Sequence, residues 1–278
     1  MWPLVAAVAV LTPAPMASLK AMSYNVRFST ANDGEYSWPH RKDRLYALLK
    51  REAADIIGLQ EALRPQITEI RHAVPGYAEV GVGRDDGVSS GEHCTILYRS
   101  DRFAVSHSGT NWFSDTPEVV ASKSWGNNIT RIVTFVRLVE LSSLRPLWVF
   151  NVHLDHESQP SRLKSVEMLR SKIASLVGKE PFLVLGDFNA GESNPAVRLM
   201  LEPIMGVSGI RDTFRAIHPG RKDVQTFNGW QEGVDGDKID YVFVSDAWAI
   251  RDAAIVWPAT KGAFESDHYP VTSTLDLN

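Results

Sequence analysis

The sequence has 278 residues, a single cysteine and a formal net charge of −4, from 29 Lys and Arg against 33 Asp and Glu. One cysteine excludes an internal disulfide framework and a zinc site built from thiolates. A slightly negative chain is also unlike proteins that coat nucleic acid regardless of its sequence, which need many Lys and Arg side chains on phosphates. A chain of this length can bury one large core without disulfides or structural metals.

Residues 1–18 differ from the rest because they carry no charged side chain. Residues 4–11 form an apolar run as long as a signal-peptide core and too short to span a membrane, so we expect no stable membrane insertion. A basic n-region and a clean Ala-x-Ala pair are both missing. The segment is therefore an export signal, a disordered tail, or an extension upstream of a true start at Met16 or Met22. An export signal would place the protein outside the cell or in the periplasm, and the alternatives leave it cytoplasmic.

Residues 19–278 are expected to form one domain, because no linker, charge block or low-complexity run divides them. Alternating or continuous apolar residues predict strands, and apolar residues at helical spacing predict helices. In chain order we expect a strand over 20–28, a helix over 41–54, a strand over 55–59, a helix over 64–74, strands over 77–83, 94–99, 129–138 and 146–154, a helix over 161–177, a strand over 181–185, a helix starting at 194–195, and strands over 238–245, 249–257 and 270–277. Many strands with a few helices predict two packed sheets with helices outside them.

Six short segments share one feature, an apolar strand that ends in Asn, Asp, Glu or His. They are 23–27, 58–61, 150–156, 185–190, 238–241 and 266–270. Each alone has a structural explanation, since Asp and Asn are common in turns after strands. Six of them in one chain favour a functional site. Carboxylate and amide oxygens suit Mg²⁺ or Mn²⁺ better than zinc.

The same residue types fit one reaction. Hydrolysis of a phosphate ester needs neutralised charge on the phosphoryl oxygens, a deprotonated water and help for the leaving oxygen. A carboxylate can activate water, Asn and His can donate to phosphoryl oxygens, and a second carboxylate can hold a His in one tautomer. The sequence therefore predicts metal-assisted hydrolysis of a phosphate ester.

In order and spacing, these segments resemble the endonuclease/exonuclease/phosphatase superfamily, the DNase I-like metal-dependent phosphoesterases. The matching motifs are Asn25, Gln60-Glu61, Asn151 with His153, 186–189, Asp240 and 266–268. The resemblance covers about 19–277, and the loops 81–87, 91–93 and 112–117 resemble those of an uncharacterised bacterial branch. It implies an α/β (α+β) fold, a four-layer α/β/β/α sandwich of two mainly antiparallel sheets with outer helices, and a site at one end of the sheets.

The resemblance also implies a role for each matching residue. Glu61 and Asn25 would hold Mg²⁺ or Mn²⁺, with Asp267 near the metal or serving a second ion, and the number of ions stays open. Asp187 would activate the attacking water. The other residues would contact or position the phosphoryl group: Asn189 as a donor, His268 and His153 as phosphate contacts, Asp240 as the partner of His268, Tyr98 as a tyrosine reaching the phosphate, and Asn151 and Arg131 as substrate-binding residues.

Several further residues have both a functional and a structural interpretation. Arg84, Glu92 and His93 lie in a glycine-rich segment that either covers the site and contacts substrate or forms a solvated hairpin. His156 faces either substrate or solvent, and Trp112 either stacks on substrate or packs in the core.

Arg41 and Arg44 follow Trp38 at the start of a predicted helix. We expect them on its solvated face, with an anchoring cluster as the alternative.

The preferred hypothesis is a monomeric enzyme acting on a small phosphorylated or phosphodiester substrate, because the charge of −4 gives no sign of a long nucleic-acid footprint. A nuclease acting on DNA or RNA is the first alternative, since it needs only a few local basic groups. Two other classes stay open: a metal-independent glycoside hydrolase that uses a carboxylate pair, and a catalytically silent binding module.

Overall fold

Two six-stranded sheets pack face to face in the computed structural model, which describes residues 15–233 and 235–278. The first sheet has the order β11-β12-β1-β2-β4-β3 and the second the order β5-β6-β7-β8-β10-β9. The strands of the first sheet are β1 (Leu19–Asn25), β2 (Ile56–Gln60), β3 (Tyr77–Val80), β4 (Ile96–Arg99), β11 (Trp248–Ile255) and β12 (Val271–Leu277). Those of the second are β5 (Phe103–Trp112), β6 (Ile132–Glu140), β7 (Pro146–His153), β8 (Phe182–Asp187), β9 (Ile210–Asp212) and β10 (Asp240–Ser245).

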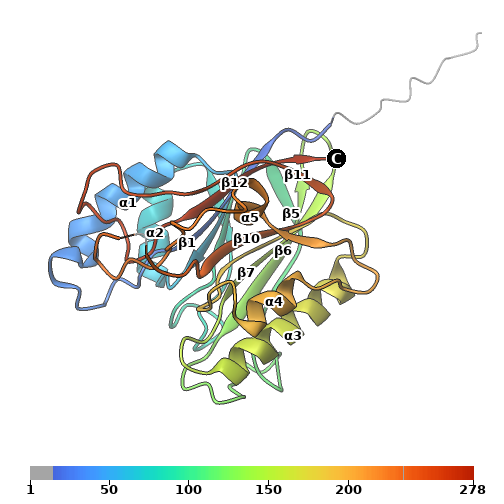
Figure 1. Cartoon of the computed structure of the whole chain (residues 1–278), viewed down its shortest axis with the longest axis horizontal. Coiled ribbons are helices and arrows are strands. Elements are labelled where there is room, and N and C mark those ends of the chain that lie inside the picture. Colours follow the sequence, from blue (N-terminus) through green and yellow to red (C-terminus); the bar gives the residue numbers. More distant parts are fainter. Residues whose placement is uncertain (1–14, 234) are drawn as a thin grey trace, which may run out of the picture.

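Helices cover the outer face of each sheet (Figure 1). Apolar side chains of α1 (Trp38–Glu52) and α2 (Arg64–Ala73) form one core with the outer face of the first sheet. Those of α3 (Gln159–Leu176) and α4 (Pro195–Leu201) form another with the outer face of the second. A third core, with residues such as Ile56 and Val149, fills the space between the sheets. The predicted four-layer α/β/β/α sandwich is confirmed.

The sheets are mixed, and each contains one parallel pair of strands that is joined by a crossover helix. β1 runs parallel to β2 with α1 as the crossover, and β7 runs parallel to β8 with α3 as the crossover. A parallel pair needs a long connection, and a helix in that connection packs on the outer face of its sheet. Because the carboxyl ends of parallel strands meet at one edge, these two units gather the residues that follow β1, β2, β7 and β8.

Four elements were not predicted: β5, β9, α5 (Thr213–Ile217) and the short 3₁₀ helix η1 (Gly34–Tyr36). β5 is an edge strand whose residues 104–108 are exposed, and its register with β6 shifts between Val105 and His107. The irregular strand buries no continuous row of apolar side chains, so its sequence lacks an alternating pattern.

The domain start predicted at residue 19 coincides with the first residue of β1. Just before it, Met16 packs into the core between the sheets, and Arg102 donates hydrogen bonds to the carbonyls of Ala17 and Ser18. Residues 1–14 of the predicted leader lie outside the described part of the chain, so the export signal stays a prediction. Among the helices of that part, none combines the length and apolar character that crossing a membrane requires.

Candidate active site

The candidate site lies at one end of both sheets, where strands of different sheets deliver polar side chains. Asn25 ends β1 opposite Gln60 of β2, and His153 ends β7 opposite Asp187 of β8. Asp240 begins the antiparallel β10, also opposite Asp187. The two sheets are joined here by a hydrogen bond of 3.0 Å from Asn25 Nδ2 to Asp187 Oδ2.

Asp187 is the centre of this group. Its Oδ2 lies 3.5 Å from His153 Nε2 and 3.8 Å from His268 Nε2, while its Oδ1 accepts the backbone N–H of Asn189 at 2.8 Å. Burial raises the pKa of Asp187 to about 7, and the nearby charge of Asp240 raises it further, against the opposing effect of His268. A carboxyl group with a pKa near neutrality can accept a proton from water, which is the role predicted for Asp187.

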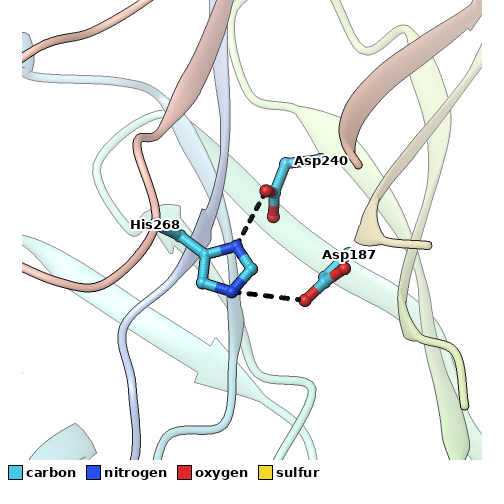
Figure 2. Close-up of side chains that lie close together, drawn as sticks. All are labelled: Asp187, Asp240 and His268. Atoms are coloured by element: carbon cyan, nitrogen blue, oxygen red, sulfur yellow. Dashed lines mark hydrogen bonds and ion pairs between the residues drawn. The ribbon is translucent and has the colours of Figure 1, made fainter. Parts of the chain in front are cut away.

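His268 is held by a hydrogen bond between its Nδ1 and Asp240 Oδ2 at 2.9 Å (Figure 2). Burial lowers the pKa of His268, but the carboxylates of Asp240 and Asp187 outweigh this effect and raise it to about 10. The ring is therefore positively charged near neutral pH and donates from both nitrogens. Asp187, Asp240 and His268 also offer ligand atoms within 4.8 Å of one another. The hydrogen bond between Asp240 and His268 favours a proton-sharing pair there over a metal centre.

Asn25 makes hydrogen bonds to two carboxylates of the site. Its Nδ2 donates to Glu61 Oε1 and to Asp187 Oδ2, both at 3.0 Å, while its Oδ1 accepts the backbone N–H of Arg27 at 3.0 Å. That backbone donor fixes which end of the amide faces the carboxylates. Asn25 thus bridges Glu61 and Asp187 through its amide N–H groups, and its assignment as a metal ligand through Oδ1, which has a second lone pair, stays a prediction.

Glu61 directly follows β2 with a φ of +62°, in the left-handed region that is costly for a residue with a side chain. It lines a cleft of about 310 Å³ together with Asp267. Hard carboxylate oxygens without thiolates are the donor chemistry that suits Mg²⁺ or Mn²⁺. The residues at this end of the sheets thus fit such an ion, and the role of Glu61 as its main ligand stays a prediction.

His153 approaches the same Asp187 oxygen as His268, with its Nε2 3.5 Å from Oδ2. Its Nδ1 lies 3.9 Å from Glu92 Oε2, and Glu92 is held by Arg84 through two hydrogen bonds of 2.7 and 2.8 Å. Burial lowers the pKa of His153, and the positive charges of Arg131 and Arg84 lower it further, so its ring is neutral near pH 7. Two histidines in opposite charge states therefore flank one carboxyl group. The expectation that Arg84 contacts substrate is wrong, because its guanidinium is buried against Glu92.

Arg131 and His156 form the wall of the cleft beyond His153. The side chain of Arg131 is 3% exposed, its Nη2 bonds to His156 Nδ1 at 2.9 Å, and its Nε lies 3.6 Å from Asp155 Oδ2. Arg131 lines the cleft, and its role as a charge partner for a phosphoryl group stays a prediction. His156 also faces the cleft, as the functional interpretation requires.

Two of the predicted residues are buried away from the cleft. Tyr98 pairs with Ile56 at the start of β2, four residues from Gln60 and so about 13 Å along the strand from the site. It packs in the core between the sheets, which rules out contact with a phosphate. Asn151 is fully buried and joins the sheets: it accepts from Gln60 Nε2 at 2.7 Å and donates to the carbonyls of Leu59 and Thr95 at 2.8 and 3.0 Å.

Two others support the loop that carries Glu92. Trp112 is 4% exposed, and its indole N–H donates to the carbonyl of Arg84 at 2.7 Å, so the predicted stacking on substrate is wrong. His93 is also buried, with its Nδ1 donating to the carbonyl of Gly91 and its backbone N–H to that of Ala62. Trp112 and the buried His93 therefore hold the loop over 81–93 in place. Glu92 is the residue of this loop that lines the cleft.

Four cleft residues were missed from the sequence: Arg27, Phe28, Ile129 and Phe227. Arg27 could have been predicted from the sequence, because it follows Asn25 by two residues within the same motif. Phe227 pairs with His268 in an isolated bridge, with ring centroids 5.1 Å apart, and is 47% exposed. One sequence carries no signal for Phe227, because an exposed aromatic residue in a loop resembles any other.

The comparison with known proteins agrees with this geometry. A profile of the Endonuclease/Exonuclease/phosphatase family matches residues 22–268, which is most of the chain. The chain belongs to this family. Members of the Endonuclease/Exonuclease/phosphatase family hydrolyse phosphate esters, so the predicted enzyme class is confirmed at that level.

Solved structures of this family from bacteria share the whole fold. An endonuclease/exonuclease/phosphatase from Bacteroides vulgatus is 28% identical, with a TM-score of 0.86 over 95% of this chain and 100% of the other. A mannosyl-6-phosphatase from Bacteroides thetaiotaomicron is 27% identical, with a TM-score of 0.82 over 92% of this chain and 99% of the other. Among curated proteins, an uncharacterized protein of Acanthamoeba polyphaga mimivirus is 30% identical over 63% of this chain and 68% of its own length.

Proposed function

We propose that this protein is a divalent-metal-dependent phosphoesterase that hydrolyses a small substrate, with a sugar phosphate as the first candidate. One observation carries the proposal: Asp187, whose pKa is near 7, lies between a charged and a neutral histidine beside a cleft of about 310 Å³. This volume lies at the lower end for small-molecule sites. The likeness to a mannosyl-6-phosphatase supports a sugar phosphate as the substrate.

In the proposed mechanism Asp187 holds the attacking water and takes its proton. Its Oδ1 accepts the backbone N–H of Asn189, and its Oδ2, which also accepts from Asn25, is the oxygen nearest to the two histidines and the one we assign to this role. His268, charged and fixed by Asp240, donates from Nε2 to an oxygen of the phosphoryl group. Arg131 adds positive charge from the wall of the cleft. These groups stabilise the negative charge that grows on the phosphoryl oxygens as the water attacks.

A divalent ion bound at Glu61, with Asp267 nearby, would neutralise further phosphoryl charge. Asn25 steadies the Glu61 carboxylate through its hydrogen bond and couples it to Asp187. His153 is neutral, faces Asp187 with Nε2 at 3.5 Å, and has Glu92 Oε2 3.9 Å from its Nδ1. We assign it a contact to the phosphoryl group or the leaving oxygen.

A substrate panel tests this proposal. It contains p-nitrophenyl phosphate and its bis-ester, hexose 6-phosphates, nucleotides, lipid head-group esters, and single- and double-stranded DNA, each with Mg²⁺ or Mn²⁺. We expect the highest kcat/KM on a small monoester, and at least a hundredfold loss for Asp187→Asn on that substrate. Equal activity of wild type and Asp187→Asn on every substrate would contradict the proposal.

A nuclease remains the second candidate because of Phe227. This exposed ring lies against His268 at the mouth of the site and could stack on a base as well as on a sugar. The same panel separates the two candidates. Higher kcat/KM on DNA than on any sugar phosphate or nucleotide would favour the nuclease.

A further inference from the structure

The guanidinium of Arg27 lies among three carboxylates at the rim of the cleft. Its Nε and Nη2 donate to the two oxygens of Asp33 at 3.1 and 3.0 Å. Its Nε also lies 3.6 Å from Asp267 Oδ2, and its Nη1 lies 4.0 Å from Glu61 Oε2. Two of these three carboxylates are the ones predicted to serve a metal ion.

The position of Arg27 is fixed from several directions. Its backbone has a φ of +53°, and its carbonyl accepts from Arg41 Nη2 at 2.7 Å and from Gln66 Nε2 at 2.9 Å. The guanidinium carbon lies 4.7 Å from the centroid of the Phe28 ring. Together with the two bonds to Asp33, these contacts hold the charged group beside the cleft, and its side chain is 28% exposed.

The position of Arg27 places a positive charge next to the two carboxylates that are predicted to serve the metal ion. The other arginines of the site lie against carboxylates elsewhere, Arg84 against Glu92 and Arg131 beside Asp155, while His268 binds Asp240 and its charge also acts on Asp267. Among the described residues, Arg27 is the one whose guanidinium lies within 4.0 Å of both Glu61 and Asp267. A fixed positive charge within 4 Å of these oxygens repels a divalent ion on that side, and repulsion at this range is strong in a partly buried site.

We propose that Arg27 is a built-in cation on the Asp267 side of the site, which limits the protein to one divalent ion, held through Glu61. This inference rests on the proposed metal-dependent function. In this inference Asp267 pairs with Arg27. The guanidinium then takes the place that a second divalent ion would otherwise occupy beside Asp267.

Binding of Mn²⁺ tests the inference without any measurement of activity. Calorimetric titration, together with electron paramagnetic resonance of free Mn²⁺, gives the number of ions and their affinity for wild type, Arg27→Met, Arg27→Lys and Glu61→Gln. Arg64→Met is the matched control, because Arg64 also holds a carboxylate, Glu79, with two hydrogen bonds and has a similar exposure of 32%. Circular dichroism checks the fold, and Arg27→Gln replaces the Met variant if that variant fails to fold.

We expect one Mn²⁺ per chain in wild type, Arg27→Lys and Arg64→Met. Arg27→Met should bind a second ion or bind the first about tenfold more tightly, because a repelling charge is gone. Two ions in wild type, or an Arg27→Met variant identical to wild type in number and affinity, would overturn the inference and leave metal dependence intact. A wild type that binds no Mn²⁺, or an unchanged Glu61→Gln, would instead overturn the metal site of the proposed function.

Discussion

At the scale of single residues, the charge state of each group in the site depends on how burial and neighbouring charges together set its pKa. Burial alone favours the neutral form of any acid or base, which explains the neutral His153 and the raised pKa of Asp187. His268 is buried to the same extent but stays charged, because the carboxylates of Asp240 and Asp187 lie against it. Carboxylate partners thus decide which histidine can donate from both nitrogens.

The dependence of kcat/KM on pH follows from these pKa values. Activity should rise as Asp187 loses its proton, at or below its pKa of about 7 once a bound cation favours the carboxylate, and should fall near pH 10 as His268 loses its proton. Asp240→Asn removes the charge that raises the pKa of His268, so the alkaline limb should move to lower pH. The exposed Asp252→Asn is the control and should keep the wild-type profile. An alkaline limb that stays in place in Asp240→Asn would contradict the role of this pair.

Arg41 shows how a local pattern can mislead. The helical position suggested a solvated side chain, but Arg41 is 0% exposed and donates to the carbonyls of Val26 and Glu265 at 2.8 and 2.9 Å and of Arg27 at 2.7 Å. Its guanidinium lies near the rings of Trp38 and Trp230. Arg44 similarly donates to the carbonyl of Phe264. The alternative of an anchoring cluster is the one that the structure supports.

Substitution of Arg41 by Lys tests whether the shape of the guanidinium, and not only its positive charge, stabilises the fold. Arg41→Lys keeps the charge but loses the fork that reaches three carbonyls, so we expect the free energy of unfolding to fall by about 2–4 kcal/mol. Denaturation by urea measures this change. Arg51→Lys, on an exposed side chain of the same helix, should change it by less than about 0.5 kcal/mol. Equal stability of the two variants would contradict the anchoring role.

At the scale of secondary-structure elements, the two strand–helix–strand units place the site. The carboxyl ends of β1, β2, β7 and β8 meet, and Asn151 of β7 bonds across to Gln60, Leu59 and Thr95 of the first sheet. β2 carries a glycine at the point of contact: a Cβ on Gly58 would lie 2.8 Å from Asn151 Oδ1. The close approach of the sheets explains how Asn25 and Asp187 come within hydrogen-bond distance.

Asn151→Ala tests the junction between the sheets. It leaves buried polar partners without their hydrogen bonds, so we expect a loss of about 2–4 kcal/mol in the free energy of unfolding. KM for a small substrate should change little, because Asn151 does not line the cleft. A large rise in KM with unchanged stability would instead restore the predicted substrate contact. Urea denaturation and steady-state kinetics on the same preparation give both quantities.

The sequence allowed most strands and helices to be predicted, because they carry regular apolar patterns and the polar residues at their ends are distinctive. Asp187, Asp240, His268 and Glu61 could be found in this way. Asn151 and Tyr98 could not be placed, since residues in one motif or strand can face the cleft or the core, and that choice depends on the partner sheet. The edge strand β5 and the cleft residue Phe227 left no local pattern.

At the scale of the whole molecule, the net charge of −4 bears on the size of the partner. A small substrate in a cleft of about 310 Å³ needs few cations beyond Arg27 and Arg131, which line it, and His268, which packs against the cleft residue Phe227. We therefore expect kcat/KM on a small monoester to fall by less than about fivefold between 50 and 200 mM salt. A protein that binds DNA through many phosphate contacts loses roughly a thousandfold in affinity over the same range. Steady-state kinetics against salt concentration distinguishes the two.

The central claim is that a divalent ion and Asp187 together hydrolyse a phosphate ester, and one measurement tests both. Wild type and Asp187→Asn are stripped with EDTA, dialysed, and assayed on a hexose 6-phosphate or p-nitrophenyl phosphate before and after addition of Mg²⁺ or Mn²⁺. We predict that stripped wild type is inactive, that the ion restores its activity, and that the ion leaves Asp187→Asn at least a hundredfold slower. Hydrolysis that survives both EDTA and the substitution would contradict the account.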